Sequence, residues 1–338
     1  MTANGSLDAR FGIDAENFGS GSTTVTTVGP VTVTNGNGIF ALATDGNVTV
    51  NAGDVTSTSN TAIIAQQTKV AGAGGSWGKT DSDGNAAAFD RSTGGLLAGA
   101  DTLVGGWRVG VLGGYSHSSF NADDRNSSGK ADNYHLGLYG GTNWGAIAFR
   151  SGAAYSWSSL STHRSVAFNG FTDGLSADYD AGTAQVFGEL AYKAETSSTF
   201  KFEPFANLAY VSVHTDGFTE TGGAAALTSA GSTTDATFTT LGLRGSTDFA
   251  LGGINATARG MLGWRHAFGD VTPTSSFAFA GGDQFTIAGV PIARDSALVE
   301  AGFDLSLASN ATLGLSYSGQ FGGGSVDNGA KVDLSVKF

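Results

Sequence analysis

The chain of 338 residues contains no cysteine, only four prolines and few charged side chains. The absence of cysteine excludes disulfides and thiolate metal sites, and it suits an oxidising compartment in which a stray thiol is a hazard. Charged residues make up 14% of the chain, well below the roughly 25% of ordinary soluble domains. No run of about 18 apolar residues occurs, which excludes a transmembrane helix.

Positive charge is also scarce, because 17 Lys and Arg residues face 29 Asp and Glu residues and leave a net charge of −12. This balance argues against a nucleic-acid partner. The five histidines show no metal-ligand spacing, and the acidic turn at residues 81–85 lacks the distal glutamate of a calcium loop. We therefore expect neither a metal nor another cofactor.

The last nine residues, 330–338, alternate strictly between apolar and polar side chains and close on Phe338. Such alternation predicts a strand with one buried face. In a transmembrane β-barrel every strand follows this pattern, because lipid-facing and lumen-facing residues alternate. A strand of this kind at the very C-terminus points to an outer-membrane barrel.

The same alternation recurs from about residue 70 onward, in about twelve segments. An even number of strands is typical of bacterial barrels, and so are connections that alternate between short and long, the short ones being periplasmic. The short connections are residues 103–106, 141–145, 195–198, 251–253 and 308–311; the long ones are 81–87, 120–132, 163–173, 216–235 and 269–295. Aromatic residues near strand ends, such as Trp77, Trp107, Tyr115, Trp157 and Trp264, suggest interfacial girdles. A soluble β-sandwich would not explain these features together. The sequence therefore predicts an all-β, antiparallel transmembrane β-barrel.

Residues 1–68 differ from the barrel region, 69–338, in being short Val/Thr runs separated by Gly and Asn. Residues 29–33 resemble residues 46–50, and residues 38–41 resemble residues 62–65. Imperfect strand repeats suggest coils of a parallel β-helix. A disordered Thr/Asn/Gly linker is the alternative.

Charged residues of the predicted barrel fall on the face opposite the apolar residues, which makes them candidates for the lumen wall. They are Arg150, Glu189, Glu203, Arg244, Arg259, Arg265, Glu300 and Asp333. A charge at the centre of the lipid face would cost about 2–4 kcal/mol, whereas a charge in a water-filled lumen costs little. Both signs are present, so we expect ion pairs, which either form a conduit that does not retain an extended chain or simply brace the barrel.

Residues 74–78 match the G-x-S-x-G pattern of a hydrolase nucleophile, but a turn follows them instead of the required helix. No set of nucleophile, base and acid is apparent in the sequence. We therefore predict that the chain is not an enzyme and has no catalytic residues; a hydrolase site at the barrel rim is the remaining catalytic alternative.

Residues 77–338 resemble the autotransporter β-domain, the translocator of type V secretion. The resemblance rests on residues 77–81, 90–95, 107–111, 134–140, 202–206, 240–244 and the closing strand to Phe338. It implies a twelve-stranded barrel in the bacterial outer membrane that exports or anchors its own N-terminal passenger at the cell surface. It also implies that the terminal aromatic residue is read by the barrel-assembly machinery, and periplasmic chaperones are expected as further partners.

Two segments receive specific roles on this interpretation. Leu334, Val336 and Phe338 are expected to form the assembly signal on the lipid-facing side of the last strand. The stretch before the first strand, with Ala62, Ile63, Ile64 and Gln66, is expected to thread the pore, as a short helix or as a strand. The family usually places a longer helix there.

We expect a monomer surrounded by outer-membrane lipid, with the N-terminal segment at the cell surface. The N-terminus lacks the basic and apolar regions of a signal peptide, so we expect the chain to be a fragment of a longer precursor. The alternative function is that of a surface adhesin or structural protein, in which residues 1–68 and the long loops bind another cell and the barrel is only an anchor.

Overall fold

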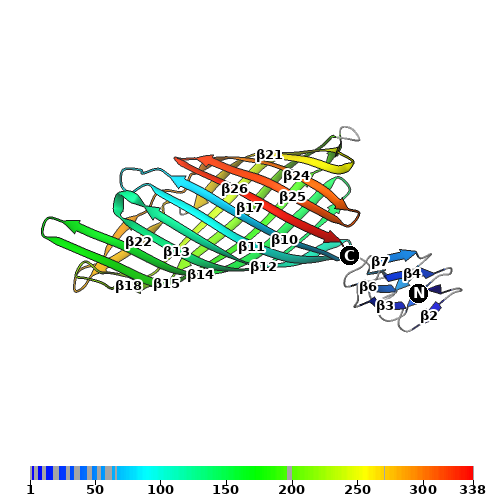
Figure 1. Ribbon diagram of the computed structural model, residues 1–338, viewed down its shortest axis with the longest axis horizontal. Coiled ribbons are helices and arrows are strands. Elements are labelled where there is room, and N and C mark those ends of the chain that lie inside the picture. Colours follow the sequence, from blue (N-terminus) through cyan, green and yellow to red (C-terminus); the bar gives the residue numbers. More distant parts are fainter. Residues whose placement is uncertain are drawn as a thin grey trace.

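The computed structural model describes residues 67–195, 200–269 and 271–337, together with the backbone of short strands between residues 2 and 64. Phe338 lies outside the described residues. Figure 1 shows the strand arrangement, which is dominated by one large barrel.

The barrel has twelve antiparallel strands, and it is closed by pairing of β10 with β26 and of β15 with β17. The strands are β10 (Gln67–Thr80), β11 (Phe89–Val104), β12 (Trp107–Ala122), β13 (Ser127–Trp144), β14 (Ile147–Phe168), β15 (Phe171–Tyr192), β17 (Phe200–Thr215), β20 (Ser232–Leu251), β21 (Ile254–Gly269), β24 (Asp295–Ala308), β25 (Ala311–Gly322) and β26 (Ser325–Lys337). A two-residue strand, β16 (Ala194–Glu195), adds to the edge of β17. The predicted barrel is confirmed.

The short connections form one rim of the barrel. Glycine pairs make two of these turns, and both residues of each pair have positive φ: Gly105 and Gly106 at 54° and 83°, and Gly252 and Gly253 at 56° and 88°. Two consecutive residues with positive φ give the turn type whose twist matches that of paired strands. These glycines therefore fix the register of β11 with β12 and of β20 with β21. We call this end the short-turn rim and the opposite end the long-loop rim.

At the long-loop rim, two of the predicted loops are instead paired strand. β12 and β13 continue to Ala122 and from Ser127, separated by a 3-10 turn, η1 (Asp123–Arg125). β14 and β15 continue to Phe168 and from Phe171. The expectation of loops at residues 120–132 and 163–173 is wrong because the backbone stays paired there: Ser127 lies opposite Arg164 in β13 and β14, and Val166 lies opposite Asp173 in β14 and β15.

The other two large connections at this rim contain a small antiparallel sheet of their own. Its order is β18 (Phe218–Thr219), β19 (Leu227–Ser229), β22 (Thr274–Phe279) and β23 (Phe285–Ala288). We call this sheet the loop sheet. Its first two strands lie between β17 and β20, and its last two lie between β21 and β24.

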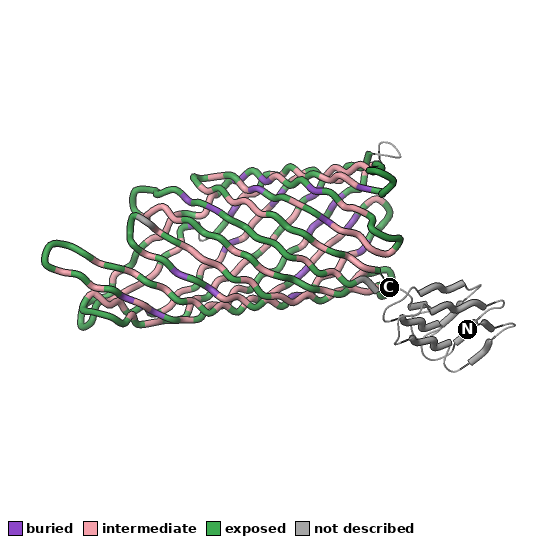
Figure 2. The backbone as a smooth tube through the Cα atoms, viewed as in Figure 1, coloured by how far each residue is buried: buried purple, intermediate pink, exposed green. Residues whose placement is uncertain are grey.

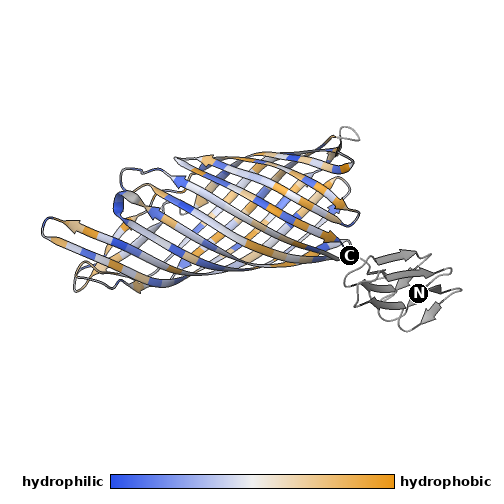
Figure 3. Ribbon diagram, viewed as in Figure 1, coloured by the Kyte–Doolittle hydropathy of each residue, from blue (hydrophilic) through white to orange (hydrophobic). Residues whose placement is uncertain are grey.

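The barrel wall is apolar outside and polar inside. Leu138 and Leu262 are 62% and 66% exposed on the outer face. Figure 2 shows buried residues scattered over the wall, without a central core, and Figure 3 shows apolar and polar residues alternating along the strands. An exposed apolar surface of this extent indicates contact with lipid.

Two bands of aromatic residues surround the outer face. Near the short-turn rim, Trp107 and Trp144 pack edge to face with centroids 6.1 Å apart. Nearer the other rim, Tyr155 and Trp157 pack at 4.7 Å, in a band that also holds Tyr115. Trp107 and Tyr115 are eight residues apart on β12, which is about 26 Å along the strand and about 20 Å along the axis at a usual barrel tilt. This spacing fits an apolar band of about 25 Å.

The described strands of the N-terminal region form three small parallel sheets, β1–β4–β7, β2–β5–β8 and β3–β6–β9. They are β1 (Thr2–Ala3), β2 (Leu7–Ala9), β3 (Ile13–Asn17), β4 (Thr23–Thr27), β5 (Val31–Val33), β6 (Ile39–Ala43), β7 (Val48–Asn51), β8 (Val55–Ser57) and β9 (Ile63–Ile64). Three strands recurring in order, each stacked on its counterpart, is the arrangement of a parallel β-helix.

Only one of the two sequence repeats corresponds to this stacking. Ile39 and Phe40 pair with Ile63 and Ile64, as the match of residues 38–41 with 62–65 suggests. The other match does not stack, because β5 pairs with β2 and β8, whereas β7 pairs with β4. Among the described residues, no helix is long and apolar enough to cross a membrane.

Candidate functional site: the inner wall of the barrel

The strand register places the eight charged residues expected in the lumen on the inner face. Arg150 lies opposite Glu189, and Glu203 lies opposite Arg244. Directly paired residues share a face of the sheet, and the neighbours of these residues two positions along each strand are on the same face. The remaining four, Arg259, Arg265, Glu300 and Asp333, follow the same alternation on β21, β24 and β26.

Four of these residues form a closed square across β14, β15, β17 and β20. Arg150 donates from Nη1 to Glu189 Oε1 and to Glu203 Oε1, both at 2.8 Å. Arg244 donates from Nη2 to Glu189 Oε2 at 2.7 Å and from Nη1 to Glu203 Oε1 at 3.0 Å. Each guanidinium therefore bridges both carboxylates, which is the strong, directional form of ion pairing.

The square is partly shielded from water on its wall side. The side chain of Glu189 is 7% exposed, and the guanidinium carbon of Arg244 lies 3.8 Å from the centre of the Phe205 ring. A carboxylate so buried needs its partners, because an unpaired buried charge is costly. We conclude that the square joins four strands and carries no net charge.

The square lies close to the short-turn rim. Arg150 is three residues from the start of β14, and Glu189 is three residues from the end of β15, which corresponds to about 10 Å along each strand. A water-accessible cavity of about 490 Å³ lies beside it, lined in part by Lys193, Lys201 and Glu300. The charges of the square therefore lie on one side of the lumen wall, near the end at which β10 begins.

The other predicted lumen residues lie apart from the square. Arg259 donates from Nε to Asp304 at 3.1 Å, and Arg265 donates to Gln320 Oε1 at 2.8 Å. Glu300 is exposed to the lumen, and Asp333 Oδ1 lies 3.2 Å from the Lys331 ammonium. Two of these four residues, Arg259 and Asp333, therefore pair with a residue of opposite charge, whereas Arg265 bonds to a neutral amide.

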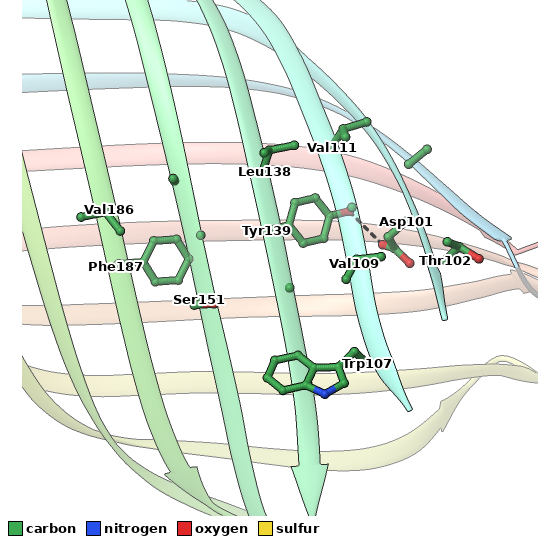
Figure 4. A pocket seen from close by; sticks show the side chains of 15 residues that line it. Asp101, Thr102, Trp107, Val109, Val111, Leu138, Tyr139, Ser151, Val186 and Phe187 are labelled. Atoms are coloured by element: carbon green, nitrogen blue, oxygen red, sulfur yellow. Dashed lines mark hydrogen bonds between the residues drawn. The ribbon is translucent and has the colours of Figure 1, made fainter. Parts of the chain in front are cut away.

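Sequence reasoning missed a second cluster near the short-turn rim, which joins Asp101, Arg108 and Tyr139. The Tyr139 hydroxyl donates to Asp101 Oδ2 at 2.8 Å (Figure 4). Arg108 pairs with the other oxygen of Asp101. Asp101 and Arg108 stand on strands joined by a two-residue turn, so the spacing of seven residues across a predicted hairpin could have revealed the pair.

On the outer side of the same wall is a shallow apolar hollow of about 820 Å³. Trp107, Val111, Leu138 and Val186 line it, and all are exposed on the lipid-facing surface (Figure 4). Its floor includes small residues such as Ala153. The hollow carries no acid–base pair on its outward side, and its surface suits lipid chains.

A third group, also missed, lies deeper in the lumen. His135 lies between two hydroxyls, with Nε2 2.9 Å from Ser116 Oγ and Nδ1 2.7 Å from Ser156 Oγ. These side chains border a lumen cavity of about 810 Å³. Neither nitrogen of this histidine contacts a carboxylate, so the arrangement lacks the acid that orients a catalytic triad.

The motifs resembling chemistry have structural roles. Ser76 of the G-x-S-x-G match lies inside strand β10, not on a strand-to-helix turn. Asp83 accepts hydrogen bonds from the backbone N–H groups of Asn85 and Ala86 at 2.9 and 2.7 Å, and these bonds lower the pKa of Asp83. Within the described chain, no three His, Asp or Glu side chains are grouped to hold a metal ion.

The two terminal segments are placed in part. Leu334 is exposed on the outer face of β26, and Val336 follows on the same face; Phe338 lies outside the described residues. Ile63 and Ile64 form β9, and Ala62 and Gln66 lie outside the described residues. Residues 67–70 belong to the barrel wall, so the expected pore-threading segment ends before Gln67.

Comparison with known proteins identifies this barrel. The model of the family described as "Autotransporter beta-domain" matches residues 70–318. This chain belongs to the autotransporter β-domain family. The chain is 39% identical over 266 residues to one extracellular serine protease of Serratia marcescens and 36% identical to another.

Each of these matches covers 78% of this chain and 25% of the relative, so the chain spans about a quarter of the relatives it matches. Solved structures with the same fold include the translocator domain of autotransporter NalP from Neisseria meningitidis. It has 15% identity and a TM-score of 0.67, over 81% of this chain and 89% of that one. The β domain of the Bordetella autotransporter BrkA has 19% identity and a TM-score of 0.57, over 80% and 98%.

Membership in this family establishes the cellular location of the barrel. The translocator lies in the bacterial outer membrane and belongs to a type V secretion system, with a passenger of its own exposed at the cell surface. The matches to the serine protease relatives extend over a quarter of those proteins, so their protease activity is not carried over to this chain.

Proposed function

We propose that the translocator exports the polypeptide attached in front of β10 through its lumen and holds it at the cell surface. The observation that supports this most directly is the closed, twelve-stranded wall with a polar, charge-balanced inner face. Twelve strands at usual spacing and tilt enclose a backbone circle about 24 Å across. Such a lumen accommodates an extended chain or a single helix.

The position of β10 defines the route. Thr68, near the start of β10, pairs with Lys337, and the N–H of Lys337 donates to the turn residue Asn310 at 2.8 Å. The first wall strand therefore begins at the short-turn rim, which is the periplasmic side of such barrels. A segment that precedes β10 and is displayed beyond the long-loop rim has to pass through the lumen.

The inner wall suits this passage because its charges neutralise one another. Two arginines and two glutamates of the square sum to zero net charge, and the Arg259–Asp304 and Arg108–Asp101 pairs also sum to zero. A wall of one sign would attract and retain oppositely charged segments of a passing chain. Paired charges keep the wall hydrated without such retention.

We further infer that the residues before Gln67, including Ala62 and Gln66, occupy the lumen once the passenger is outside. Because β9 ends only two residues before β10 begins, Ile63 and Ile64 lie within reach of the short-turn rim. Their entry into the lumen requires β9 to separate from β6. Occupation of this kind would also close a pore that otherwise leaks solutes.

Epitope tags on intact cells test the route. The full chain, expressed behind a secretory leader, receives a tag at its N-terminus, in the turn at Gly252, or in the loop sheet at Gly281. We expect antibody to bind the N-terminal and Gly281 tags on intact cells and the Gly252 tag only after the outer membrane is broken. An N-terminal tag that behaves like the Gly252 tag, while Gly281 stays accessible, would contradict export.

The attached passenger decides the activity of the whole protein, and the barrel contributes transport without catalysis. The serine protease relatives make a secreted protease one candidate for a passenger of this barrel. The parallel pairing of β1 to β9 favours a β-helical passenger segment, which also suits the alternative role of a surface adhesin. Adhesion by cells displaying residues 1–66 on the barrel, absent for cells displaying the barrel alone, would support that role.

Assembly is proposed to depend on the last strand and on partners outside the chain. Leu334 and Val336 share the outer face of β26, and Phe338 continues their alternation in the sequence. We propose that the barrel-assembly machinery reads this face, after periplasmic chaperones deliver the unfolded chain. Deleting Phe338 should reduce the amount of heat-modifiable barrel in the outer membrane, whereas an unchanged yield would contradict this proposal.

A further inference from the structure

The loop sheet prolongs the barrel wall beyond the outer aromatic band. Its strands β18, β19, β22 and β23 continue β17, β20, β21 and β24 in the same order. The backbones of Thr221, which follows β18, and Ser176, on β15, exchange two hydrogen bonds at 2.9 and 2.8 Å. Figure 1 shows β18 and β22 at the end of the barrel away from the C-terminus. We call the loop sheet together with residues 171–180 of β15 the wall extension.

The polarity of the wall is reversed in this extension, because its inner face is aromatic. One row of residues is paired across the loop sheet and therefore shares a face: Phe218, Ser229, Phe277 and Phe285. The Phe218 ring stacks on Tyr179, an inner-face residue of the neighbouring β15, with centroids 4.3 Å apart. The whole row therefore faces inward.

The aromatic row is continuous and part of its surface is open. The rings of Phe218 and Phe285 each lie 6.3 Å from the ring of Phe277, measured between centroids. Phe279 and Ile287 stand two residues along from this row on the same face, and they are 48% and 46% exposed. Exposed apolar side chains gathered on one face indicate a surface that another element covers.

The outer face of the same strands is polar. The hydroxyls of Thr219 and Thr228 are hydrogen-bonded at 3.1 Å, and those of Ser276 and Thr286 at 3.0 Å. In the membrane the apolar residues of the wall face outward to lipid. Beyond the aromatic band the outside is water, so the apolar residues of the extension are on its inner face. A sheet with one apolar face is stable when that face is buried against another element.

The rim extends on one side of the barrel. β14 ends at Phe168, eleven residues past Trp157, whereas β10 ends at Thr80, three residues past Trp77. The wall is therefore low at β10 and high at β14 and β15. A chain that leaves the lumen passes beside the aromatic face, with space on the opposite, low side of the rim.

Chain length indicates which segment arrives at this face. Leu175 lies 17 residues from Tyr192, where β15 ends at the short-turn rim; this is about 56 Å along the strand and about 43 Å along the axis at a usual tilt. About 13 extended residues span that distance. A chain running through the lumen from Gln67 therefore reaches the level of Leu175 at about residue 54.

Threading of this segment also uncovers one end of the parallel β-helix. When the residues just before Gln67 enter the lumen, β8 separates from β5 and β9 separates from β6. The last coil outside is then β5, β6 and β7, residues 31–51, which we call the end coil. The uncovered end of a repeat structure needs a cap. The end coil carries one charged residue, Asp45, and its β6 reads Ile-Phe-Ala-Leu-Ala, a composition that suits an apolar surface.

We infer that the wall extension is the docking surface for the end coil, and that its aromatic inner face caps the β-helix above the mouth of the lumen. This inference rests on the proposed function, because the end coil reaches the face only by passing through the lumen. The dimensions agree: the five strands of the extension span about 19 Å at usual spacing, and a strand of five residues such as β6 is about 17 Å long.

Cross-linking on cells tests the docking, because the chain has no cysteine of its own. Leu42→Cys places one thiol in the end coil. The second thiol replaces one of two adjacent serines of β22, by Ser275→Cys on the inner face or Ser276→Cys on the outer face. Intact cells producing the full chain, with a secretory leader and an N-terminal tag, are treated with a short bis-maleimide. We expect about tenfold more intramolecular product with the inner thiol, because docking raises the local concentration of one thiol near the other.

Substitution of exposed apolar residues then tests the face itself. Phe279→Ser combined with Ile287→Ser removes apolar surface at half-exposed positions, and it should lower cross-linking at the inner thiol to the level of the outer one. Leu251→Ser, at an exposed apolar residue of the short-turn rim, should leave cross-linking unchanged. Heat-modifiability on gels verifies that each barrel is folded.

The N-terminal tag separates this inference from the proposed function. A tag exposed on intact cells with equal cross-linking of the inner and outer thiols would overturn the docking and leave export standing. A product that joins two copies of the chain, in place of the intramolecular one, would also overturn it and assign the face to a second copy. A tag that stays hidden on intact cells would contradict export, and the docking would fall with it.

Discussion

The two ends of the barrel solve different physical problems. At the short-turn rim, the strands end in turns of about two residues and the inner wall is braced by the Arg150–Glu189–Glu203–Arg244 square. At the long-loop rim, β14 continues eleven residues past Trp157 to Phe168, and the loop sheet packs its own aromatic side chains. At the short-turn rim the strands end close to the membrane surface, whereas the long-loop rim extends beyond it and packs side chains as a small soluble domain does.

This difference shows where stability originates in a barrel whose apolar surface faces lipid. In the membrane, burial of apolar side chains in a core contributes little to the stability of the wall. Among the described residues one small buried cluster, of Ala148, Ala191 and Phe205, lies beside the square. Cross-strand hydrogen bonds and ion pairs therefore hold the bilayer end. Beyond the outer aromatic band, water restores the hydrophobic effect, and side chains such as Leu175 are 2% exposed.

The largest effect is expected from a substitution that disrupts the ion-pair square at the short-turn rim. Glu189→Gln leaves two arginines with one carboxylate, and we expect the free energy of unfolding to fall by about 3–5 kcal/mol, as when one partner of a buried ion pair is removed. Urea unfolding of the barrel in lipid vesicles, followed by tryptophan fluorescence, measures it. Glu300→Gln, at an exposed position of the same wall, is the control. A loss no larger than that of the control would show that the square does not brace the wall.

A somewhat smaller effect separates the two faces of the wall. Leu138→Arg places a charge on the outer face between the aromatic bands, and we expect a loss of about 2–4 kcal/mol. Gln185→Arg puts the same side chain on the inner face of β15, where water is present, and should cost well under half as much. The same unfolding assay compares them. Equal losses would mean that the two faces do not differ in polarity as the register indicates.

The smallest effect concerns the outer aromatic band. The Tyr115 hydroxyl donates to Asp132 Oδ1 at 2.5 Å. Tyr115→Phe removes this one exposed hydrogen bond, and we expect a loss of stability smaller than either of the two losses above. Tyr134→Phe is the matched control, because the Tyr134 ring is a neighbour of the Tyr115 ring, with centroids 5.4 Å apart. If both substitutions are neutral, the hydroxyl–carboxylate bond is not part of what positions this end at the membrane surface.

Much of the barrel could be predicted from residue order alone. The alternation around Leu136 and Leu138 determines which face meets lipid, and a one-residue shift would reverse every side chain. Glycine pairs such as Gly252 and Gly253 mark the short turns, because positive φ at both positions favours glycine. These signals are local, so strand number, strand direction and the inner position of Arg150 or Glu203 follow without knowledge of the fold.

What the sequence could not supply were contacts between residues far apart in the chain. Alternation put Arg150, Glu189, Glu203 and Arg244 on the inner face, but only closure of β15 onto β17 brought them into one square. The polar strands beyond the outer band read as loops because their side chains face water on both sides. The loop sheet depends on pairing of Leu227 with Phe279, which are 52 positions apart. Local patterns determined the wall of this protein, and tertiary structure decided its bracing and the pairing of the loop sheet at the long-loop rim, because a pattern along one strand carries no information about which distant strand becomes its neighbour.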